Sequence, residues 1–307
     1  MKIYLSKIKE DWIIDRIKKE WVKENKSVST KFLTNADIIW LIAPWLWNKT
    51  PTKYLKNKKV LCSIYHIDFN SFDKKQEKDF YQLEEFVDEF HVISNKTKNQ
   101  LKQLTDKKIT SIPLWINQSN YFYIQDKDLL RNKFGFNKND YLIGSFQRDT
   151  EGSDLKSPKL IKGPDIFINI AKEIHTSNPN LKVILSGKRR HYVIEELNKH
   201  KIPFQYYEMA DIATLNELYN ILDLYIVSSR IEGGPQAIVE CGISKTPIVS
   251  TDVGVASEIL HPESIFDPSK FFNSKPNIEY AYEKSKKLII PVGMKPYFEM
   301  FKKLYEN

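Results

Sequence analysis

The sequence has little of what marks secreted, metal-stapled or membrane-spanning proteins. Its 307 residues include only two cysteines, Cys62 and Cys241, in no metal-like spacing, so neither a disulfide framework nor a structural zinc site is expected. The first residues carry charges throughout and lack the apolar stretch of a signal peptide. No run approaches the roughly 18 apolar residues that a membrane-spanning helix needs. We therefore expect a cytoplasmic protein in a reducing compartment.

Motifs of several enzyme classes are also missing. No Gly-x-Gly-x-x-Gly follows a strand, and no P-loop, His-Glu-x-x-His or Gly-x-Ser-x-Gly occurs. These absences argue against dehydrogenases, P-loop nucleotidases, zinc proteases and serine hydrolases. The basic run at residues 188–191 fits a phosphate contact and a solvated loop equally well.

Asp126 and Asp128 form the Asp-x-Asp pattern with which some metal-dependent sugar transferases hold a divalent ion. They stand before a helical segment and not at the end of a strand. A helix N-cap followed by an acidic residue in the first turn explains both without a metal. The sequence therefore predicts no metal site here.

The apolar content is high enough for a large core. Hydrophobic residues make up 41% of the chain and charged residues 28%, which excludes a mainly disordered protein. Apolar runs of strand length alternate with segments of helical periodicity, as in parallel βαβ units. We expect two successive α/β domains at 1–118 and 119–290, followed by a helical segment at 291–307. The expected strands are 2–5, 38–43, 60–65, 90–93, 141–146, 182–185, 224–227 and 247–250, and the expected helices are 11–22, 96–104, 165–174, 215–222, 235–241, 279–287 and 296–305.

Positive charge is concentrated in the first half. Residues 1–120 hold 22 Lys and Arg against 15 Asp and Glu, whereas residues 121–307 hold 25 against 24. A basic domain suggests an anionic partner. An anionic membrane could be met by Trp45, Trp47 and the lysines that follow them. Nucleic acid is less favoured, because no helix-turn-helix or aromatic RNA-binding signature is present. The lysines could also simply cover a solvated face.

One segment, residues 224–260, combines residue types that bind phosphate and sugar. An apolar strand leads into Ser229, Glu232, Gly233, Gly234 and Pro235, and a helix with Glu240 follows. Glycines let a ligand approach the backbone closely, proline suits the first helical position, and free N–H groups at a helix start attract phosphate. Carboxylates are poor phosphate ligands, so Glu232 and Glu240 are better suited to accept hydrogen bonds from sugar hydroxyls.

This segment resembles the signature of retaining family-4 glycosyltransferases of the two-Rossmann (GT-B) architecture, the glycosyltransferases group 1. The shared pattern is a strand, Ser-x-x-Glu-Gly and a helix, with Glu232 and Glu240 in Glu-x7-Glu spacing. Gly144 and Arg148, followed by Lys162, resemble the Gly-x-x-x-Arg and Lys-Gly elements of the same family. The resemblance extends over about 140–262, and more loosely over 90–118.

The resemblance implies two Rossmann-like domains that face each other across a cleft, a nucleotide-sugar site in the cleft, and a last helix that crosses back to the first domain. Arg148 and Lys162 would hold the diphosphate and neutralise the leaving group, so that neither a metal nor another cofactor is required. Glu232 would contact the donor sugar and Glu240 the ribose. His66, after the predicted strand 60–65, resembles a histidine of the first domain that contacts the donor sugar. The remaining donor-binding positions implied are Gly144, Ser229, Gly233, Gly234 and Pro235.

The implied activity is a retaining, metal-independent transfer of a hexose from a nucleotide-diphosphate sugar, UDP-linked by default, to a glycan or lipid-linked acceptor. Such an enzyme would serve polysaccharide biosynthesis in the cytoplasm or at the inner face of the membrane. The donor base, sugar, acceptor, linkage and oligomeric state stay open. A nucleotide-sugar epimerase on the same fold and a DNA-modifying or nucleic-acid-binding protein are the alternatives.

The sequence departs from the family in its first domain, which is short. Residues 1–34 contain no glycine, and Ser6 and Lys7 stand where the family has a glycine-rich loop. Residues 149–161 form an enlarged loop between Arg148 and Lys162, which we expect to cover the site.

Overall fold

The computed structural model describes residues 1–6 and 13–307, and the chain divides into two compact units. Unit 1 comprises Met1–Trp115 and Pro291–Asn307, and unit 2 comprises Ile116–Ile290. The sequence placed the first boundary after residue 118. Ile116 belongs to unit 2 because it forms a parallel bridge with Ile289, and its N–H donates to the Leu288 carbonyl at 2.8 Å.

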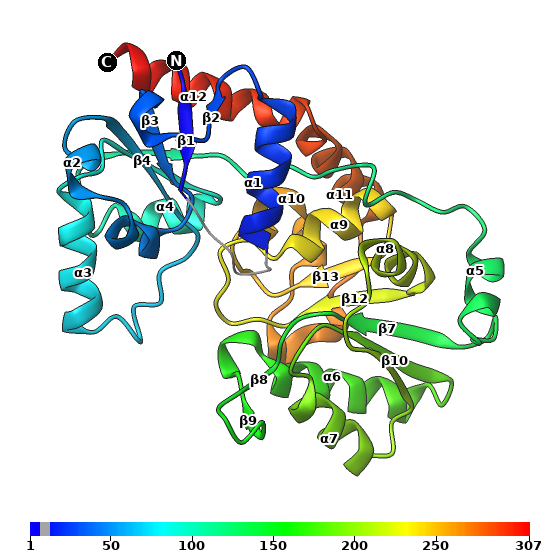
Figure 1. Ribbon diagram of the computed structural model, residues 1–307. Coiled ribbons are helices and arrows are strands. Elements are labelled where there is room, and N and C mark those ends of the chain that lie inside the picture. Colours follow the sequence, from blue (N-terminus) through cyan, green and yellow to red (C-terminus); the bar gives the residue numbers. More distant parts are fainter. Residues whose placement is uncertain (7–12) are drawn as a thin grey trace. The chain divides into compact units, whose positions relative to one another are not determined.

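Unit 1 is built on a six-stranded parallel sheet in the order β2-β1-β3-β4-β5-β6 (Figure 1). This is a doubly wound order with the switch of direction between β1 and β3. The strands are β1 (Ile3–Leu5), β2 (Ser29–Thr30), β3 (Ile38–Leu41), β4 (Lys59–Ile64), β5 (Glu89–Val92) and β6 (Lys108–Ser111). The helices are α1 (Ile13–Glu24), α2 (Thr52–Leu55), α3 (Lys74–Glu84), α4 (Asn95–Leu101) and α12 (Lys295–Glu306).

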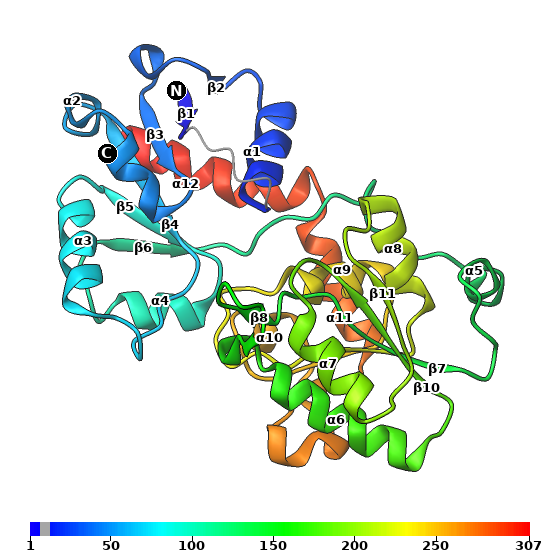
Figure 2. The same cartoon turned by 60° about the horizontal axis from the view of Figure 1, so that its bottom comes forward.

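The two faces of this sheet are covered by different helices. On one face, Phe80 and Leu83 of α3 and Leu101 of α4 pack with alternate residues of the strands. On the other face, Trp21 of α1 and Phe301 of α12 pack against Trp40 of β3, with ring centroids 5.5 Å and 5.2 Å from that of Trp40. Figure 2 shows the ribbons of α1 and α12 beside this sheet. Residues 291–307 therefore complete the core of unit 1.

Unit 2 has a five-stranded parallel sheet in the order β11-β10-β7-β12-β13. Its strands are β7 (Tyr141–Ser145), β10 (Leu181–Ser186), β11 (Phe204–Tyr207), β12 (Leu224–Val227) and β13 (Ile248–Ser250), and a small antiparallel hairpin adds β8 (Thr150–Glu151) and β9 (Ser157–Pro158). Its helices are α5 (Lys127–Lys133), α6 (Pro164–Ser177), α7 (His191–Lys199), α8 (Ile212–Ile221), α9 (Gln236–Ser244), α10 (Ala256–Ile259) and α11 (Ile278–Ser285). Figure 1 shows α6 and α7 on one face of the sheet and α8 and α9 on the other, and each face has its own apolar core.

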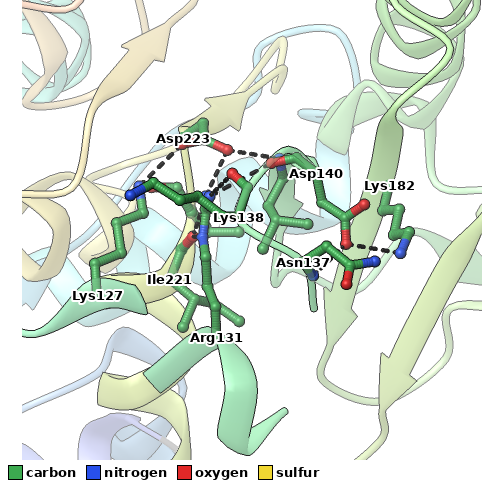
Figure 3. A network of polar contacts seen from close by, with 10 residues as sticks. Lys127, Arg131, Asn137, Lys138, Asp140, Lys182, Ile221 and Asp223 are labelled. Carbon is green, nitrogen blue, oxygen red and sulfur yellow. Dashed lines mark hydrogen bonds and ion pairs between the residues drawn. The ribbon is translucent and has the colours of Figure 1, made fainter. Parts of the chain in front are cut away.

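A network of polar contacts closes the amino-terminal end of this sheet (Figure 3). Arg131 of α5 donates to Asp223 Oδ2 at 2.6 Å and twice to the Ile221 carbonyl, and Lys127 Nζ lies 3.0 Å from Asp223 Oδ1. Asp223 Oδ2 also accepts the Leu142 N–H at 2.8 Å. The network therefore fixes α5 to the point where β7 and β12 begin.

The predicted α/β class with parallel sheets is confirmed, and every predicted strand and helix overlaps a described element of the same kind. Residues 11 and 12 of the predicted helix 11–22 and Lys7 lie outside the described residues. The strands and α-helices that were not predicted are β2, α2, α3, β6, β8, β9, α7, β11 and α10. Among the residues that the structure describes, no helix combines the length and the apolar character needed to cross a membrane.

Candidate functional site

The predicted site residues of unit 2 gather at the carboxyl ends of β7 and β12. These two strands are neighbours at the centre of the sheet, where the strand order changes direction. In open parallel sheets of this kind, ligands bind outside the carboxyl ends of the strands at that switch point. The loop after β7 carries Gln147 and Arg148, and the loop after β12 carries Ser229 and Glu232.

Lys162 and Glu232 form an ion pair at this position. Lys162 ends a short helical turn that precedes α6, and Glu232 lies in the loop between β12 and α9. Their side chains are only 22% and 15% exposed. The pair therefore presents one cation and one carboxylate side by side at the carboxyl end of the sheet.

Gly163 brings the Lys162 turn against the end of β12. Its φ of 60° lies in the left-handed region, and an added Cβ would stand 1.8 Å from the Ser228 carbonyl oxygen. The N–H groups of Arg230 and Ile231 both donate to the Ile161 carbonyl, at 2.8 Å and 3.1 Å. The two loops therefore meet through backbone contacts that only glycine at 163 permits.

Gln147 links the same two loops through its side-chain amide. Its Nε2 donates to the Lys162 carbonyl at 2.8 Å, and its Oε1 accepts from Ser229 Oγ at 3.0 Å. Ser229 Oγ also lies 3.4 Å from Glu232 Oε1. Gln147 was not among the predicted site residues, although it lies next to Arg148 in the Gly-x-x-x-Arg motif.

Two further cations lie beside the Lys162–Glu232 pair. Arg148 is exposed and donates its Nε–H to the Thr150 carbonyl at 3.0 Å. Burial lowers the pKa of Lys159, and the positive charges of Arg148 and Lys162 lower it further. Lys159, which stands three positions before Lys162, was not among the predicted site residues. Three cations in one place favour an anionic ligand.

The start of α9 approaches the site through its two glycines. The backbone of Gly233 and Gly234 packs on Gly254, where an added Cβ would lie 2.2 Å from the Gly233 carbonyl oxygen. Pro235 is the N-cap of α9, one position before the first helical residue that the sequence predicted it to be. The first N–H groups of α9 therefore follow directly on two glycines and Pro235, so no long side chain stands in front of them.

Glu240 lies inside α9 and is buried. The Tyr219 hydroxyl donates to Glu240 Oε2 at 2.8 Å. Burial raises the pKa of Tyr219 well above its ordinary value, and the charge of Glu240 adds to that shift. The Tyr219 hydroxyl thus stays protonated and holds one oxygen of this carboxylate in place.

Gly144 has a packing role in the structure. It lies within β7, and an added Cβ would stand 2.3 Å from Leu222 Cδ1. A core side chain thus fills the space over its Cα. Its predicted contact with the donor stays a prediction.

His66 follows β4 and belongs to unit 1. There it lines a cavity of about 450 Å³ together with Trp45, Trp47, Asn48 and Phe72. Its predicted contact with a donor sugar stays a prediction.

The two other polar motifs have structural roles. Asp126 is the N-cap of α5 and accepts the Leu129 N–H at 2.8 Å, as predicted, and Asp128 pairs with Lys138. Arg190 is buried, with its Nε 2.5 Å from Asp149 Oδ2, so this arginine of the basic run belongs to an internal ion pair. Within the described ranges, no group of three His, Cys, Asp or Glu side chains is arranged to hold a metal ion.

A doubly wound sheet with cations and a carboxylate at its switch point is an arrangement that suits phosphate-bearing ligands. Residues 126–290, which include all of these groups, match the family model of the glycosyl transferases group 1. The chain belongs to that family and is a glycosyltransferase. No curated protein matches its sequence.

Solved structures show that the fold is that of GT-B glycosyltransferases. Anabaena HepE in complex with UDP and glucose has a TM-score of 0.76 at 12% identity, over 99% of this chain and 100% of that one. Sucrose-phosphate synthase from Thermosynechococcus elongatus has a TM-score of 0.73 at 13% identity, over 98% and 81%. A glycosyltransferase from Rickettsia africae has a TM-score of 0.66 at 18% identity, over 98% and 84%.

Proposed function

We propose that unit 2 binds a nucleotide-diphosphate sugar, UDP-linked, and that the enzyme transfers the sugar with retention of configuration, as in family 4. The observation that carries the proposal is the Lys162–Glu232 pair beside Arg148 and Lys159. Cations suit the diphosphate, and a neighbouring carboxylate suits sugar hydroxyls. Structures of Anabaena HepE contain UDP, glucose or UDP-glucose, which supports UDP as the nucleotide.

In the proposed reaction the chain's own cations replace a metal ion. Arg148 and Lys162 contact the diphosphate and stabilise the negative charge that grows on it as the glycosidic bond breaks. Glu232 accepts hydrogen bonds from the sugar, Glu240 binds the ribose, and the backbone at Gly233, Gly234 and Pro235 faces the phosphates. Retention then requires attack from the same face as the departing diphosphate, with no protein nucleophile.

The acceptor is proposed to be a glycan or a lipid-linked sugar, in polysaccharide biosynthesis in the cytoplasm. Contact with an anionic membrane is part of the same proposal. An epimerase would consume no acceptor, so analysis of all products separates that alternative. A nucleic-acid-binding protein would show a steep salt dependence of binding to DNA or RNA.

Thermal unfolding with UDP, GDP, ADP or CMP, each in EDTA and in Mg²⁺, tests the donor and the metal. At about a hundred times its Kd, a nucleotide stabilises the folded protein by roughly 2.7 kcal/mol, so we expect UDP in EDTA to raise Tm by several degrees. A shift seen only with Mg²⁺ would contradict the metal-independent site.

Substitution of Lys162 tests the site itself. Lys162→Ala should weaken UDP binding by about tenfold to a hundredfold, the range for a lost hydrogen bond to a charged group. Lys199→Ala is the matched control, because Lys199 also pairs with a glutamate but lies at the end of α7. Equal UDP affinity of the two variants would refute the proposed role of Lys162.

Retention and the role of Glu232 need a readout of transfer. Glu232→Gln should keep UDP binding and lose most sugar transfer, because the amide presents one acceptor oxygen where the carboxylate presents two. NMR of the product should show the anomeric configuration of the donor. A product of inverted configuration would refute the retaining mechanism.

A further inference from the structure

Unit 1 contains a groove of about 1000 Å³ between α1 and the edge strand β2. Its apolar lining comes from Tyr4, Leu5, Val22 and Phe32. Phe32 is 65% exposed, the largest exposed fraction among the large apolar side chains that the structure describes in unit 1. The groove therefore combines an apolar floor with a protruding aromatic ring.

Lysines surround this groove. Lys19 and Lys23 lie four positions apart on the side of α1 away from its buried face, Lys26 follows the end of α1, and Lys31 follows β2. All four are exposed, and none forms an ion pair or hydrogen bond within the part of the chain that the structure describes. Asp15 is the one acidic residue among the described lining residues. The charge of the groove therefore complements an anionic partner.

Lys18 also lines the groove, and its Nζ donates to the Leu5 and Ser6 carbonyls at 3.2 Å and 2.9 Å. This lysine is held by the end of β1. The four outer lysines are the ones that can turn toward a partner.

The other basic stretch of unit 1, residues 45–59, is more strongly engaged within the fold. Trp47 stacks on Phe86 with ring centroids 6.0 Å apart. Lys58 donates to the Thr34 and Ala36 carbonyls, and Lys59 lies 3.8 Å from Asp88. The tryptophan and the two lysines therefore already have partners, which favours the α1–β2 groove as the anion-binding face.

We propose that the α1–β2 groove docks this protein on the surface of an anionic phospholipid bilayer. Lys19, Lys23, Lys26 and Lys31 contact the phosphate headgroups, and Phe32 enters the interface beside them. An apolar body rimmed by lysines is the arrangement that binds at the boundary between headgroups and acyl chains. The inference rests on the membrane contact named in the proposed function and deepens it, because it assigns that contact to one face of unit 1, apart from the nucleotide site.

Sedimentation with phosphatidylcholine vesicles, with and without one third phosphatidylglycerol, tests the proposal on the full chain. We expect binding only to the anionic vesicles and less binding at high salt. The triple variant Lys19→Gln, Lys23→Gln and Lys26→Gln should bind these vesicles about a hundredfold more weakly. Each lysine near an anionic surface contributes about 1 kcal/mol, which is slightly less than a tenfold change in affinity. Phe32→Ser should weaken binding by about tenfold.

The triple variant Lys49→Gln, Lys53→Gln and Lys56→Gln is the matched control, because it removes the same charge from three exposed lysines of the other stretch. Its loss of vesicle binding should be less than a fifth of the loss seen in the groove variant. Equal losses in the two triple variants, or no sedimentation of the wild type, would overturn the proposal. So would retention on single-stranded nucleic acid through the groove lysines without vesicle binding.

Two measurements on the same samples keep the result interpretable. An unchanged thermal unfolding curve shows that the groove variants are folded. An unchanged shift with UDP shows that the nucleotide site is intact, so vesicle binding and nucleotide binding can fail independently of each other.

Discussion

Gly163 occupies the tightest position in the candidate site. Its left-handed backbone and its contact with the Ser228 carbonyl leave no room for a side chain. The Lys-Gly dipeptide therefore serves two purposes in one turn: lysine supplies the charge, and glycine lets that turn reach the end of β12. A change at the glycine should disturb the site as much as a change at the lysine.

Gly163→Ala should lower the free energy of unfolding by about 3 kcal/mol or more, because backbone strain and overpacking act together. Gly135→Ala is the matched control: Gly135 also has a positive φ, of 76°, but nothing lies within 4 Å of its added Cβ, so strain of about 1 kcal/mol is expected. Urea unfolding of both variants measures the difference. Similar losses would contradict the steric account of the Lys162 turn.

At the same scale, several site residues could be predicted from the sequence and others could not. Glu232 and Lys162 stand in recognisable motifs, but their ion pair joins positions far apart in the chain. Gln147 and Lys159 have no periodic or motif signal of their own. Gly144 was predicted to bind the donor, and only the tertiary structure shows that an added Cβ there would contact Leu222.

Among the elements, α5 depends on charge more than on apolar packing. It is anchored by Arg131, whose side chain is nearly buried, and by Lys127, both of which contact Asp223 (Figure 3). The carboxylate of Asp223 also accepts a hydrogen bond from the Leu142 N–H of β7. Removing this one carboxylate leaves a buried guanidinium without its counter-charge.

Asp223→Ala should therefore lower the free energy of unfolding by about 3 kcal/mol. Asp128→Ala, in α5 itself, is the comparison. The pair of Asp128 with Lys138 is exposed and should contribute less than about 1 kcal/mol. Denaturant unfolding followed by circular dichroism separates the two. A small effect of Asp223→Ala would show that the backbone carbonyls of Ile221, Lys138 and Asp140 satisfy Arg131 without the carboxylate.

The elements that the sequence failed to predict have weak local signals. β11 is an edge strand of half-buried residues, without the continuous apolar run of a central strand. α3 is polar at most positions and buries Phe80 and Leu83 only. Its start did carry a signal, since Asp73 and Gln76 form a capping box, which is a pattern visible in the sequence.

For the whole molecule, the core of unit 1 is formed by segments from both ends of the described chain. Phe301 of α12 is fully buried against Trp21 and Trp40, and the Tyr297 hydroxyl of the same helix donates to the Ile112 carbonyl at 3.2 Å. Residues 291–307 therefore contribute to the stability of a unit formed mainly by residues 1–115. Unit 2 has separate cores formed by residues 116–290.

Phe301→Ala should destabilise unit 1 by about 3–5 kcal/mol, the usual cost of removing a buried aromatic side chain. Hydrogen exchange should accelerate in α1 and β3 and stay unchanged in β7 and β10. Phe298→Ala, on the exposed side of the same helix, should have little effect on either unit. Faster exchange in β7 and β10 would contradict the independence of the two cores.

The sequence by itself determined the α/β class, most of the strands and helices, and the membership in a glycosyltransferase family, because hydrophobic periodicity and short motifs are local properties of a chain. The tertiary structure decided which residues share a site and which share a core. Lys162 meets Glu232, and Trp40 meets Phe301, only because strands and helices distant in the sequence pack side by side. The basic half of the chain shows the same division: its charge is visible in the sequence, but only the fold separates the lysines of the α1–β2 groove from those already paired.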